Sequence, residues 1–218
     1  MKQVAVVGLG QFGTHLAKQL AVQGCDVLVL DAAESRVSAV RDDVHRALIA
    51  DAKSFEALES VVAPTVDEVA VCLGDHIEAS ILCTLHLSQI GVKKILATAI
   101  NEDHANILGR VGAHSVIFPD LETAERTARR MAHPNLLDYF PFAEEYRIME
   151  YVMPRLLVGK TLRQSGLRAD YRLLALAIRV GTAGEYHFMP DAEEVLHEGD
   201  ILVVLGREID LARFSVLE

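Results

Sequence analysis

The stretch VAVVGLGQFG at residues 4–13 decides which fold this 218-residue sequence predicts. Its apolar first half is typical of a strand that is buried on both faces. Its glycines, Gly8, Gly10 and Gly13, have the spacing GxGxxG and open an amphipathic helix predicted over residues 11–23. The first glycine permits a tight turn, the second lets backbone approach a phosphate, and the third lets the helix pack against the strand. The stretch therefore predicts a βα turn that binds phosphate through free backbone N–H groups.

An acidic residue follows at the distance that this motif requires. Asp31 comes after the next apolar run, residues 27–30, about twenty positions beyond the glycines. A carboxylate there can accept hydrogen bonds from both hydroxyls of a ribose. The glycines alone would also fit a tight turn without a ligand, but strand, glycines, helix, strand and acid in this order favour a nucleotide.

The alternation of apolar and amphipathic segments predicts the rest of the first domain. Short apolar runs at 4–7, 27–30, 47–50, 69–73, 95–99 and 115–118 alternate with helical patterns at 11–23, 34–41, 54–61, 76–90 and 103–109. Parallel strands covered by helices have this pattern. We expect a Rossmann-like doubly wound parallel sheet, with a further helix over 121–131, in a nucleotide-binding domain of residues 1–133.

The remaining residues, 134–218, differ in character. β-rich patterns occupy 146–152, 173–180, 186–189 and 201–205, whereas the prolines near 133–141 break regular structure. The sequence predicts a small α+β domain here, and the overall fold class is α/β.

Two further strand ends belong to the same edge of a doubly wound sheet. Asp51 and Ala52 follow the third predicted strand, and Leu73 and Gly74 end the fourth. Because ligands bind beyond the carboxyl ends of such strands, we expect these residues to flank an adenine. Asp51 fits equally well as a cap of the next helix, together with Ser54.

Composition and charge restrict the function classes. Hydrophobic residues make up 51% and charged residues 24% of the chain, which is typical of a globular protein. The formal net charge of −10 argues against a nucleic-acid partner, since phosphate backbones are bound through basic faces. No apolar run reaches the ~20 residues of a membrane span, and the opening residues do not have the pattern of a signal peptide. We expect a cytoplasmic protein whose three cysteines are reduced and which reaches a membrane only through a partner.

The sequence lacks an evident catalytic constellation. Hydride transfer needs an acid or base and charges that orient the substrate, but Val, Leu and Ile dominate the residues after the predicted sheet. The histidines His76, His104, His114 and His133 are scattered, and we expect surface or capping roles for them. These features favour a binding and switching protein over an enzyme, with a small NAD(P)-dependent oxidoreductase as the alternative.

Several segments resemble those of a known family. They are the glycine stretch at 6–13, IEASIL at 77–82, VGAHSVIFPD at 111–120, and residues 167–171, 176–179, 199–202 and 211–214. Through them nearly the whole chain is similar to the RCK (KTN) proteins, which join a TrkA-N and a TrkA-C domain. Those proteins are regulatory subunits of Trk/Ktr-type potassium transporters.

The resemblance implies an octameric ring, assembled as a tetramer of dimers on a membrane-embedded potassium pore subunit at the inner face of the cell membrane. Adenine nucleotides or NAD(H) would change the shape of the ring through a difference in affinity between two ring states, and so gate ion flow. The C-terminal domain, residues 134–218, would supply a dimer interface. An RCK regulator of another cation transporter remains open as an alternative.

The nucleotide site of the family carries over to this chain residue by residue. By resemblance it comprises Gly8, Gly10, Gln11, Phe12, Gly13, Asp31, Ala32, Arg36, Asp51, Ala52, Leu73, Gly74 and Glu78. Members that respond to ATP carry arginine where this chain has Gln11 and lysine where it has Thr98, and glutamine is common in place of Glu78. Because these differences leave the γ-phosphate poorly matched, we expect ADP, AMP or NAD(H) to bind at least as well as ATP.

Two more expectations come from the resemblance. Asp120 matches an acidic position that meets a cation between neighbouring domains, and the alternative role for Asp120 is the N-cap of a helix starting at Leu121. Arg168 and Ala169 fit the cyclic di-AMP site of relatives, but Leu174 stands where a polar residue often reads the base. This difference argues against cyclic di-AMP as a ligand.

Overall fold

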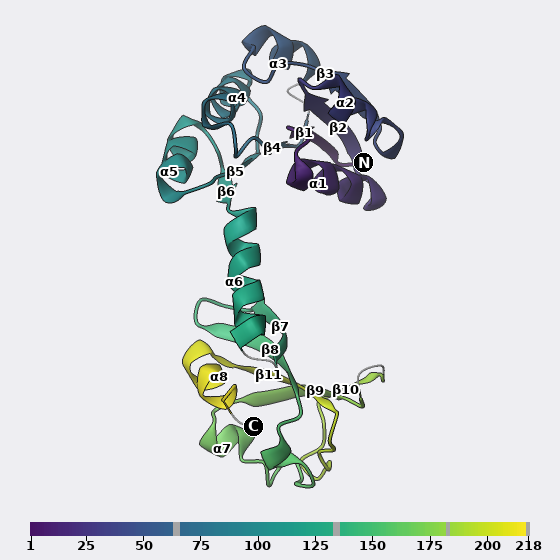
Figure 1. Ribbon diagram of the computed structural model, residues 1–218, viewed down its shortest axis with the longest axis vertical. Coiled ribbons are helices and arrows are strands. Elements are labelled where there is room, and N and C mark those ends of the chain that lie inside the picture. Colours follow the sequence, from purple (N-terminus) through teal and green to yellow (C-terminus); the bar gives the residue numbers. More distant parts are fainter. Residues whose placement is uncertain (63–65, 133–135, 182–183, 217–218) are drawn as a thin grey trace. The chain divides into compact units, whose positions relative to one another are not determined.

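The structure, a computed structural model, describes residues 1–62, 66–132, 136–181 and 184–216, and only the backbone at 129–130 and 136–141. The chain divides into two compact units, Met1–Leu121 and Glu122–Glu218, whose elements are labelled in Figure 1. Each unit is described by itself. The domain boundary at 133/134 stays a prediction.

The first unit is built on a parallel sheet. Its strands are β1 (Gln3–Val7), β2 (Asp26–Asp31), β3 (Arg46–Ile49), β4 (Glu68–Val71), β5 (Ile95–Thr98) and β6 (Ser115–Ile117). The order across the sheet is β3-β2-β1-β4-β5-β6, and all neighbouring pairs are parallel. The chain passes from edge strand β3 to β4 on the far side of β1, which makes the ends of β1 and β4 the topological switch point. The predicted Rossmann-like doubly wound sheet is confirmed.

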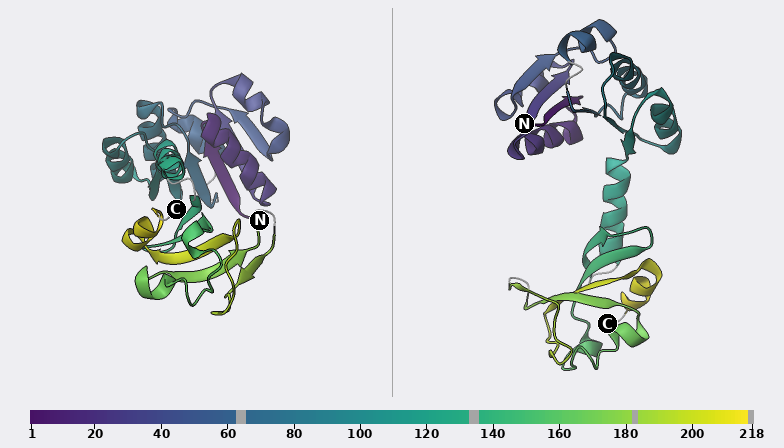
Figure 2. Two further views of the ribbon diagram at one scale, coloured as in Figure 1. Left: turned by 60° about the horizontal axis from the view of Figure 1, so that its bottom comes forward. Right: turned by 180° about the vertical axis from the view of Figure 1, so that it is seen from behind.

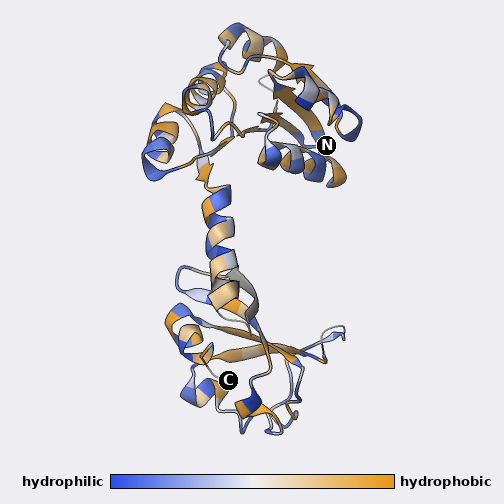
Figure 3. Cartoon of the chain, viewed as in Figure 1, coloured by the Kyte–Doolittle hydropathy of each residue, from blue (hydrophilic) through white to orange (hydrophobic). Residues whose placement is uncertain are grey.

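Helices cover both faces of this sheet (Figure 2). They are α1 (Gln11–Val22), α2 (Glu34–Ser38), α3 (Phe55–Val61), α4 (Ile77–Ile90) and α5 (Glu102–Val111), with a 3-10 turn η1 (Arg41–Asp43). In β1, Val6 packs with residues of α1 and α2, whereas its neighbour Val7 packs with residues of α3, α4 and α5. Since successive strand side chains point to opposite faces, the four buried positions of β1, residues 4–7, are all apolar, and the strands of this sheet are largely orange in Figure 3.

The second unit is an antiparallel sheet with short helices. Its strands are β7 (Leu136–Pro141), β8 (Tyr146–Val152), β9 (Leu174–Arg179), β10 (Tyr186–Phe188) and β11 (Ile201–Arg207), in the order β10-β9-β11-β8-β7. The helices are η2 (Arg155–Leu157), α7 (Leu167–Asp170) and α8 (Glu208–Phe214). The rings of Tyr151 and Phe214 meet edge to face at 5.2 Å in its core, and the Tyr151 hydroxyl donates to the Leu211 carbonyl (3.3 Å). This unit is the expected small α+β domain.

Two elements near the division between the units differ from the sequence expectation. β7 forms where prolines predicted irregular chain, because it is an edge strand with Pro141 at its end, where a missing N–H breaks no ladder in the sheet interior. α6 (Pro119–Ala132) begins two residues earlier than predicted, since proline is favoured in the first turn of a helix. Residues 133–135 lie outside the described residues.

The helices are short throughout the described part of the chain. α4 and α6 have 14 residues each. Among the described residues, none of the helices combines the length and the apolar character that crossing a bilayer requires.

Candidate functional site

A cleft of about 490 Å³ opens at the carboxyl ends of β1 to β4, where a doubly wound sheet binds its ligand. We call it the N-terminal cleft. Its lining comprises Val7, Gly8, Leu30, Asp31, Ala32, Ala33, Arg36, Asp51, Ala52, Lys53, Leu73, His76, Ile77, Glu78 and Ala79.

The three glycines after β1 are required for different reasons. Gly8 has φ +95°, and a Cβ there would lie 2.6 Å from the Cys72 carbonyl oxygen. A Cβ at Gly13 would overlap the Gly8 carbonyl oxygen, whereas a Cβ at Gly10 would meet nothing within 4 Å. Chain packing thus accounts for Gly8 and Gly13, and the open space at Gly10 is the place where a phosphate can approach the backbone. Because Gly10 is the N-cap of α1 and has no side chain, the first turn of that helix is left for an anion to cap.

Asp31 is buried, with 8% of its surface exposed, and backbone groups hold its carboxylate. Its Oδ2 accepts a hydrogen bond from the Leu9 N–H (2.7 Å), and its Oδ1 accepts one from the Ala33 N–H (2.8 Å). The guanidinium of Arg36 lies 3.5 Å from Oδ2. These contacts fix the carboxylate beside the glycine turn, and each oxygen keeps lone-pair capacity for a ribose hydroxyl.

The turn after β3 separates the two interpretations of Asp51. Ser54 is the N-cap of α3, since its Oγ accepts a hydrogen bond from the Ala57 N–H (3.1 Å). Asp51 Oδ1 accepts a hydrogen bond from the Lys53 N–H (2.9 Å), and Asp51 lines the cleft. The geometry therefore favours the cleft role for Asp51.

The start of α4 contributes another side of the cleft. His76 precedes the helix, and residues 77–79 form its first turn. Glu78 is the third carboxylate of the lining, in which Arg36 and Lys53 are the two permanently cationic side chains. The acidic side chains of the lining thus outnumber Arg36 and Lys53, so the backbone of the glycine turn has to supply most of the attraction for a highly charged anion.

The structure brings together many, but not all, of the sequence-predicted site residues. Those that line the cleft are Gly8, Asp31, Ala32, Arg36, Asp51, Ala52, Leu73 and Glu78. Those outside its lining are Gly10, Gln11, Phe12 and Gly13, beside it at the start of α1, and Gly74, after β4. Sequence reasoning missed Val7, Leu30, Ala33, Lys53, His76, Ile77 and Ala79, whose only signal was their closeness to strand ends already expected there.

Within the described part of the chain, Asp120 does not belong to a group of potential metal ligands. It is exposed in the first turn of α6, one residue inside the helix rather than at its N-cap. Among the described residues, no three His, Cys, Asp or Glu side chains gather as a metal site. A cation at Asp120 would need ligands from elsewhere and stays a prediction.

Among the side chains with catalytic potential, those of Cys83 and His104 are buried and that of Cys72 is partly buried. All three cysteines are free thiols, and burial raises the pKa of Cys72 and of Cys83 to about 12, so neither is a nucleophile at neutral pH. The surface or capping role expected for His104 is wrong, because its side chain is packed between α4 and α5 and the residue is only 2% exposed. His133 lies outside the described residues.

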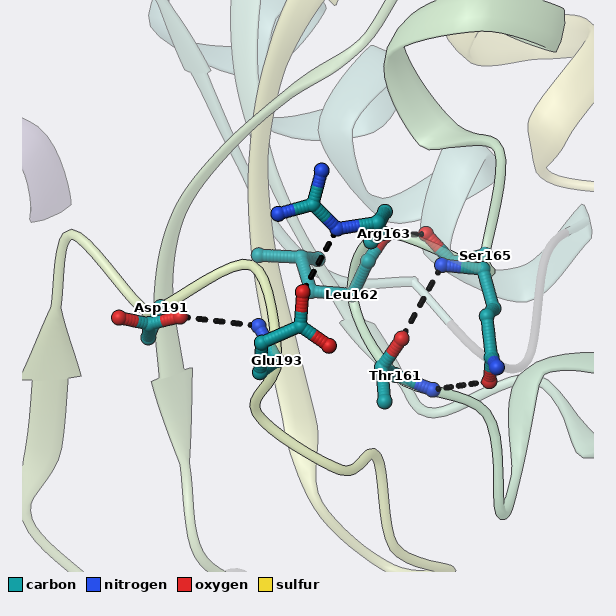
Figure 4. Close-up of polar contacts among 7 residues, drawn as sticks. Thr161, Leu162, Arg163, Ser165, Asp191 and Glu193 are labelled. Carbon is teal, nitrogen blue, oxygen red and sulfur yellow. Dashed lines mark hydrogen bonds and ion pairs between the residues drawn. The ribbon is translucent and has the colours of Figure 1, made fainter.

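A second cleft, of about 430 Å³, lies in the second unit, and we call it the C-terminal cleft. Its lining comprises Leu162, Arg163, Gly166, Leu167, Arg168, Ala169, Leu173, Leu174, Ala175, Pro190 and Ala192. Figure 4 shows the side chain of Arg163 pointing to that of Glu193. Its Nε donates to Glu193 Oε1 (2.7 Å), and the neighbouring turn is closed by Thr161, whose Oγ1 accepts from the Gln164 N–H (3.2 Å). Arg168, Ala169 and Leu174 thus share one cleft, and the argument against cyclic di-AMP stays a prediction.

Known proteins match this chain along nearly its whole length. The TrkA-N domain matches residues 4–119, and the TrkA-C domain matches residues 148–217. Ktr system potassium uptake protein C of Bacillus subtilis (strain 168) is 36% identical over 214 residues, which cover 98% of this chain and 96% of that protein. Ktr system potassium uptake protein A of Vibrio alginolyticus is 32% identical over 211 residues, which cover 97% and 95%.

Solved structures share the fold. The GsuK channel has a TM-score of 0.69 at 17% identity, over 99% of this chain and 39% of that one. The GsuK RCK domain has a TM-score of 0.65 at 17% identity, over 99% and 47%. The resemblance that the sequence motifs carry is confirmed, and the chain belongs to the family of TrkA-N/TrkA-C (RCK) proteins that includes the Ktr system potassium uptake proteins A and C.

Proposed function

We propose that this protein is the nucleotide-sensing regulatory subunit of a potassium transporter. It acts in the cytoplasm, at the inner face of the membrane, on a membrane-embedded pore subunit. The observation that carries the proposal is the N-terminal cleft, in which a glycine turn and the backbone-held carboxylate of Asp31 lie at the switch point of the sheet. Similarity over nearly the full chain to proteins named for potassium uptake supports the transporter as the target.

The ligand of the N-terminal cleft is an adenine nucleotide. Its diphosphate binds the first turn of α1 at Gly10, and its ribose hydroxyls donate to the carboxylate of Asp31. The GsuK channel, which has the same fold, has been solved with NAD bound. Arg36, half-exposed and 3.5 Å from Asp31, is placed to approach the ribose or phosphates.

ADP, AMP or NAD(H) binds at least as well as ATP. Gln11, the first residue of α1, is uncharged, and Thr98 is buried with its hydroxyl donating to the Val71 carbonyl (3.4 Å). Neither supplies a cation for a γ-phosphate, and Glu78 adds a negative charge to the cleft. The preference therefore falls on ligands with fewer terminal phosphate charges.

Binding and melting measurements test the ligand. Each of ATP, ADP, AMP and NADH is titrated calorimetrically into the full chain, and its effect on the melting temperature is recorded, because a ligand of the folded state raises that temperature. We expect saturable binding of ADP, AMP or NADH with an affinity equal to or above that of ATP. A clearly higher affinity for ATP than for the other three contradicts the proposed ligand preference. If none of the four ligands binds or raises the melting temperature, the nucleotide site itself is contradicted.

The regulatory role acts through assembly. The chain self-associates as dimers, which form a ring on the pore subunit, and a nucleotide shifts the ring between two states only by binding one more tightly than the other. The candidate pore subunit is expressed in cells that lack their own potassium uptake systems. We expect these cells to grow at low potassium only when they also express this chain. Uptake restored equally without it contradicts the role.

Two alternatives have separate tests. A small NAD(P)-dependent oxidoreductase would change NADH absorbance with a hydroxy or carbonyl substrate, whereas we expect no turnover. An RCK regulator of another cation transporter would bind nucleotide equally well but leave potassium uptake unchanged.

Asp120 is retained as a ligand for a cation between subunits, and its replacement by asparagine should then weaken divalent-cation effects on ring assembly.

A further inference from the structure

A buried hydrogen bond joins α4 to α5 immediately behind the N-terminal cleft. The Ser80 hydroxyl oxygen and the Nε2 of His104 are 2.7 Å apart. Ser80 is 0% and His104 2% exposed, so water does not reach the pair. This seclusion excludes a role as a nucleophile and base, and the pair needs another explanation.

The surroundings of the pair favour a neutral imidazole. The Ser80 hydroxyl also lies 3.2 Å from the Ile77 carbonyl, to which it can donate while its oxygen accepts from Nε2–H of His104. The buried Nδ1 of His104 finds no hydrogen-bond partner among the described residues. A proton on Nδ1 would therefore be a buried donor without an acceptor, on a ring that has become charged.

Among the described residues of α4, α5 and the strands beside them, the charged side chains lie on the surface rather than against His104. The titratable side chains around the α4–α5 pair are mostly exposed, namely His76, Glu78, Glu102, Asp103, Arg110 and His114. Two further titratable residues belong to α4 itself. Cys83 lies on its buried face in the core, and the ring of His86 contacts that of Phe55 of α3 edge to face. β5 and β6, the adjoining strands, carry no titratable residue. Burial alone accounts for the lowered pKa of His104, below its ordinary value of 6.5.

The pair is connected to the cleft by the first turn of α4. Residues 77–79 line the cleft, and the Ser80 N–H closes that turn by donating to the His76 carbonyl (2.9 Å). On the other side, the His104 N–H donates to the N-cap side chain of Asn101 (2.8 Å), which fixes the start of α5. A shift of Ser80 away from His104 therefore moves one side of the cleft.

We propose that Ser80 and His104 form a positioning pair that holds the cleft side of α4 against α5 only while the imidazole is neutral, so that acid loosens nucleotide binding. The inference rests on the nucleotide binding proposed above. Protonation of Nδ1 makes the buried imidazole of His104 a cation whose Nδ1–H has no acceptor. To hydrate this charge, α4 and α5 separate locally and admit water. The pair thus makes ligand affinity fall as pH decreases below 6.5, the ordinary pKa of histidine.

Affinity as a function of pH tests the pair. ADP is titrated into the full-length wild type and the His104→Gln variant at about pH 7.5 and about pH 5.5, on either side of the histidine range. The glutamine can donate to Ser80 but cannot take up a proton, and comparison at equal pH cancels the titration of ADP itself. We expect equal affinities at the higher pH and an affinity of the wild type about 2- to 10-fold below that of the variant at the lower pH, the effect of one hydrogen bond. An equal loss in both proteins overturns the proposal.

Two controls separate this pair from other causes. His76→Gln removes the exposed histidine of the cleft and should keep the acid loss of the wild type, since His104 is intact. Ser80→Ala should bind more weakly at the higher pH as well, because the partner is missing at every pH. If Ser80→Ala binds like the wild type at both values, the pair does not position the cleft.

Hydrogen exchange decides the inference even if the nucleotide proposal fails. Without ligand, the amides of residues 80–83, the first that donate within α4, should lose protection on acidification in the wild type, relative to intrinsic exchange, and keep it in His104→Gln. Unchanged protection in both proteins overturns the positioning role. Absence of ADP binding at the higher pH, with the expected exchange pattern, overturns the nucleotide function alone.

Discussion

The two clefts of this protein have similar volumes and different construction. The N-terminal cleft, about 490 Å³, is bordered by a glycine turn and by a buried carboxylate that two backbone N–H groups hold. The C-terminal cleft, about 430 Å³, takes its charge from arginine side chains, of which Arg163 is 69% exposed and paired with Glu193. The carboxylate that borders the first is held by backbone groups, whereas the charge that borders the second stands on a side chain that solvent reaches.

This difference decides what a substitution should do. Several groups that border the N-terminal cleft, such as Gly8 and Asp31, also join β1, β2 and α1, so a change at these groups alters both folding and ligand affinity. Charged groups at the edge of the C-terminal cleft contribute little to folding, because solvent screens them and their order costs side-chain entropy. Substitutions in both clefts test this contrast.

The largest effect is expected at Gly13. Alanine there would force its Cβ into the Gly8 carbonyl oxygen, which must move together with α1. We expect a loss of about 2–3 kcal/mol or more of unfolding free energy, the size of an overpacked core, together with loss of nucleotide binding. Thermal and denaturant unfolding of Gly13→Ala measure it.

Gly10→Ala is the matched control. A Cβ at Gly10 meets nothing within 4 Å, and its φ of −67° suits alanine. The melting temperature should therefore stay close to that of the wild type, while the affinity for ADP falls by about 10- to 100-fold as the phosphate is displaced. Normal ADP affinity in Gly10→Ala would show that no phosphate approaches this glycine.

Asp31→Asn should have the next largest effect. The amide group turns one NH₂ toward the N–H of Leu9 or of Ala33, so that a donor faces a donor. We expect a cost of about 1–3 kcal/mol in stability and about 10- to 100-fold in ADP affinity. Calorimetry on Asp31→Asn and Asp31→Glu separates the two effects, since glutamate keeps the charge. A stable Asp31→Asn with full affinity would contradict the ribose role.

The sequence predicts the first unit well because its signals are local. The GxGxxG spacing reflects contacts between residues five apart in the chain, such as Gly8 and Gly13, and the apolar runs reflect strands covered on both faces. The sequence does not decide between two roles for Asp51, since capping and cleft lining both place an acid after a strand. Only the bond from Ala57 to Ser54 separates them.

The remaining features depend on contacts between distant segments. His104 looks like any helix-start histidine in the sequence, and its burial against Ser80, 24 residues earlier, follows from the packing of α5 on α4. β7 has prolines nearby and becomes a strand because β8 offers it an edge. Lys53 and His76 line the cleft because the turns after β3 and before α4 place them there. The identity of these residues alone does not indicate that position.

A smaller effect is expected from Glu78→Gln. Removing one carboxylate from the N-terminal cleft reduces repulsion toward phosphate charge, so affinity should rise most for ATP, less for ADP and least for AMP. Because the side chain is exposed, we expect a gain of about 2- to 5-fold for ATP that fades at high salt. Calorimetry at two salt concentrations measures it. An equal gain for all three nucleotides would indicate a change of shape rather than of charge.

The smallest effect is expected at the C-terminal cleft. The ion pair of Arg163 and Glu193 is 2.7 Å long, but both side chains are about two-thirds exposed, at 69% and 66%. Arg163→Ala should therefore change the unfolding free energy by at most about 1 kcal/mol and leave ADP affinity unchanged, because the N-terminal cleft is lined entirely by residues of the other compact unit. A double-mutant cycle with Glu193→Gln, read by denaturant unfolding, isolates the pair. A coupling well above that size, or a shift in ADP affinity, would mean that the C-terminal cleft is as tightly built into the fold as the glycine turn.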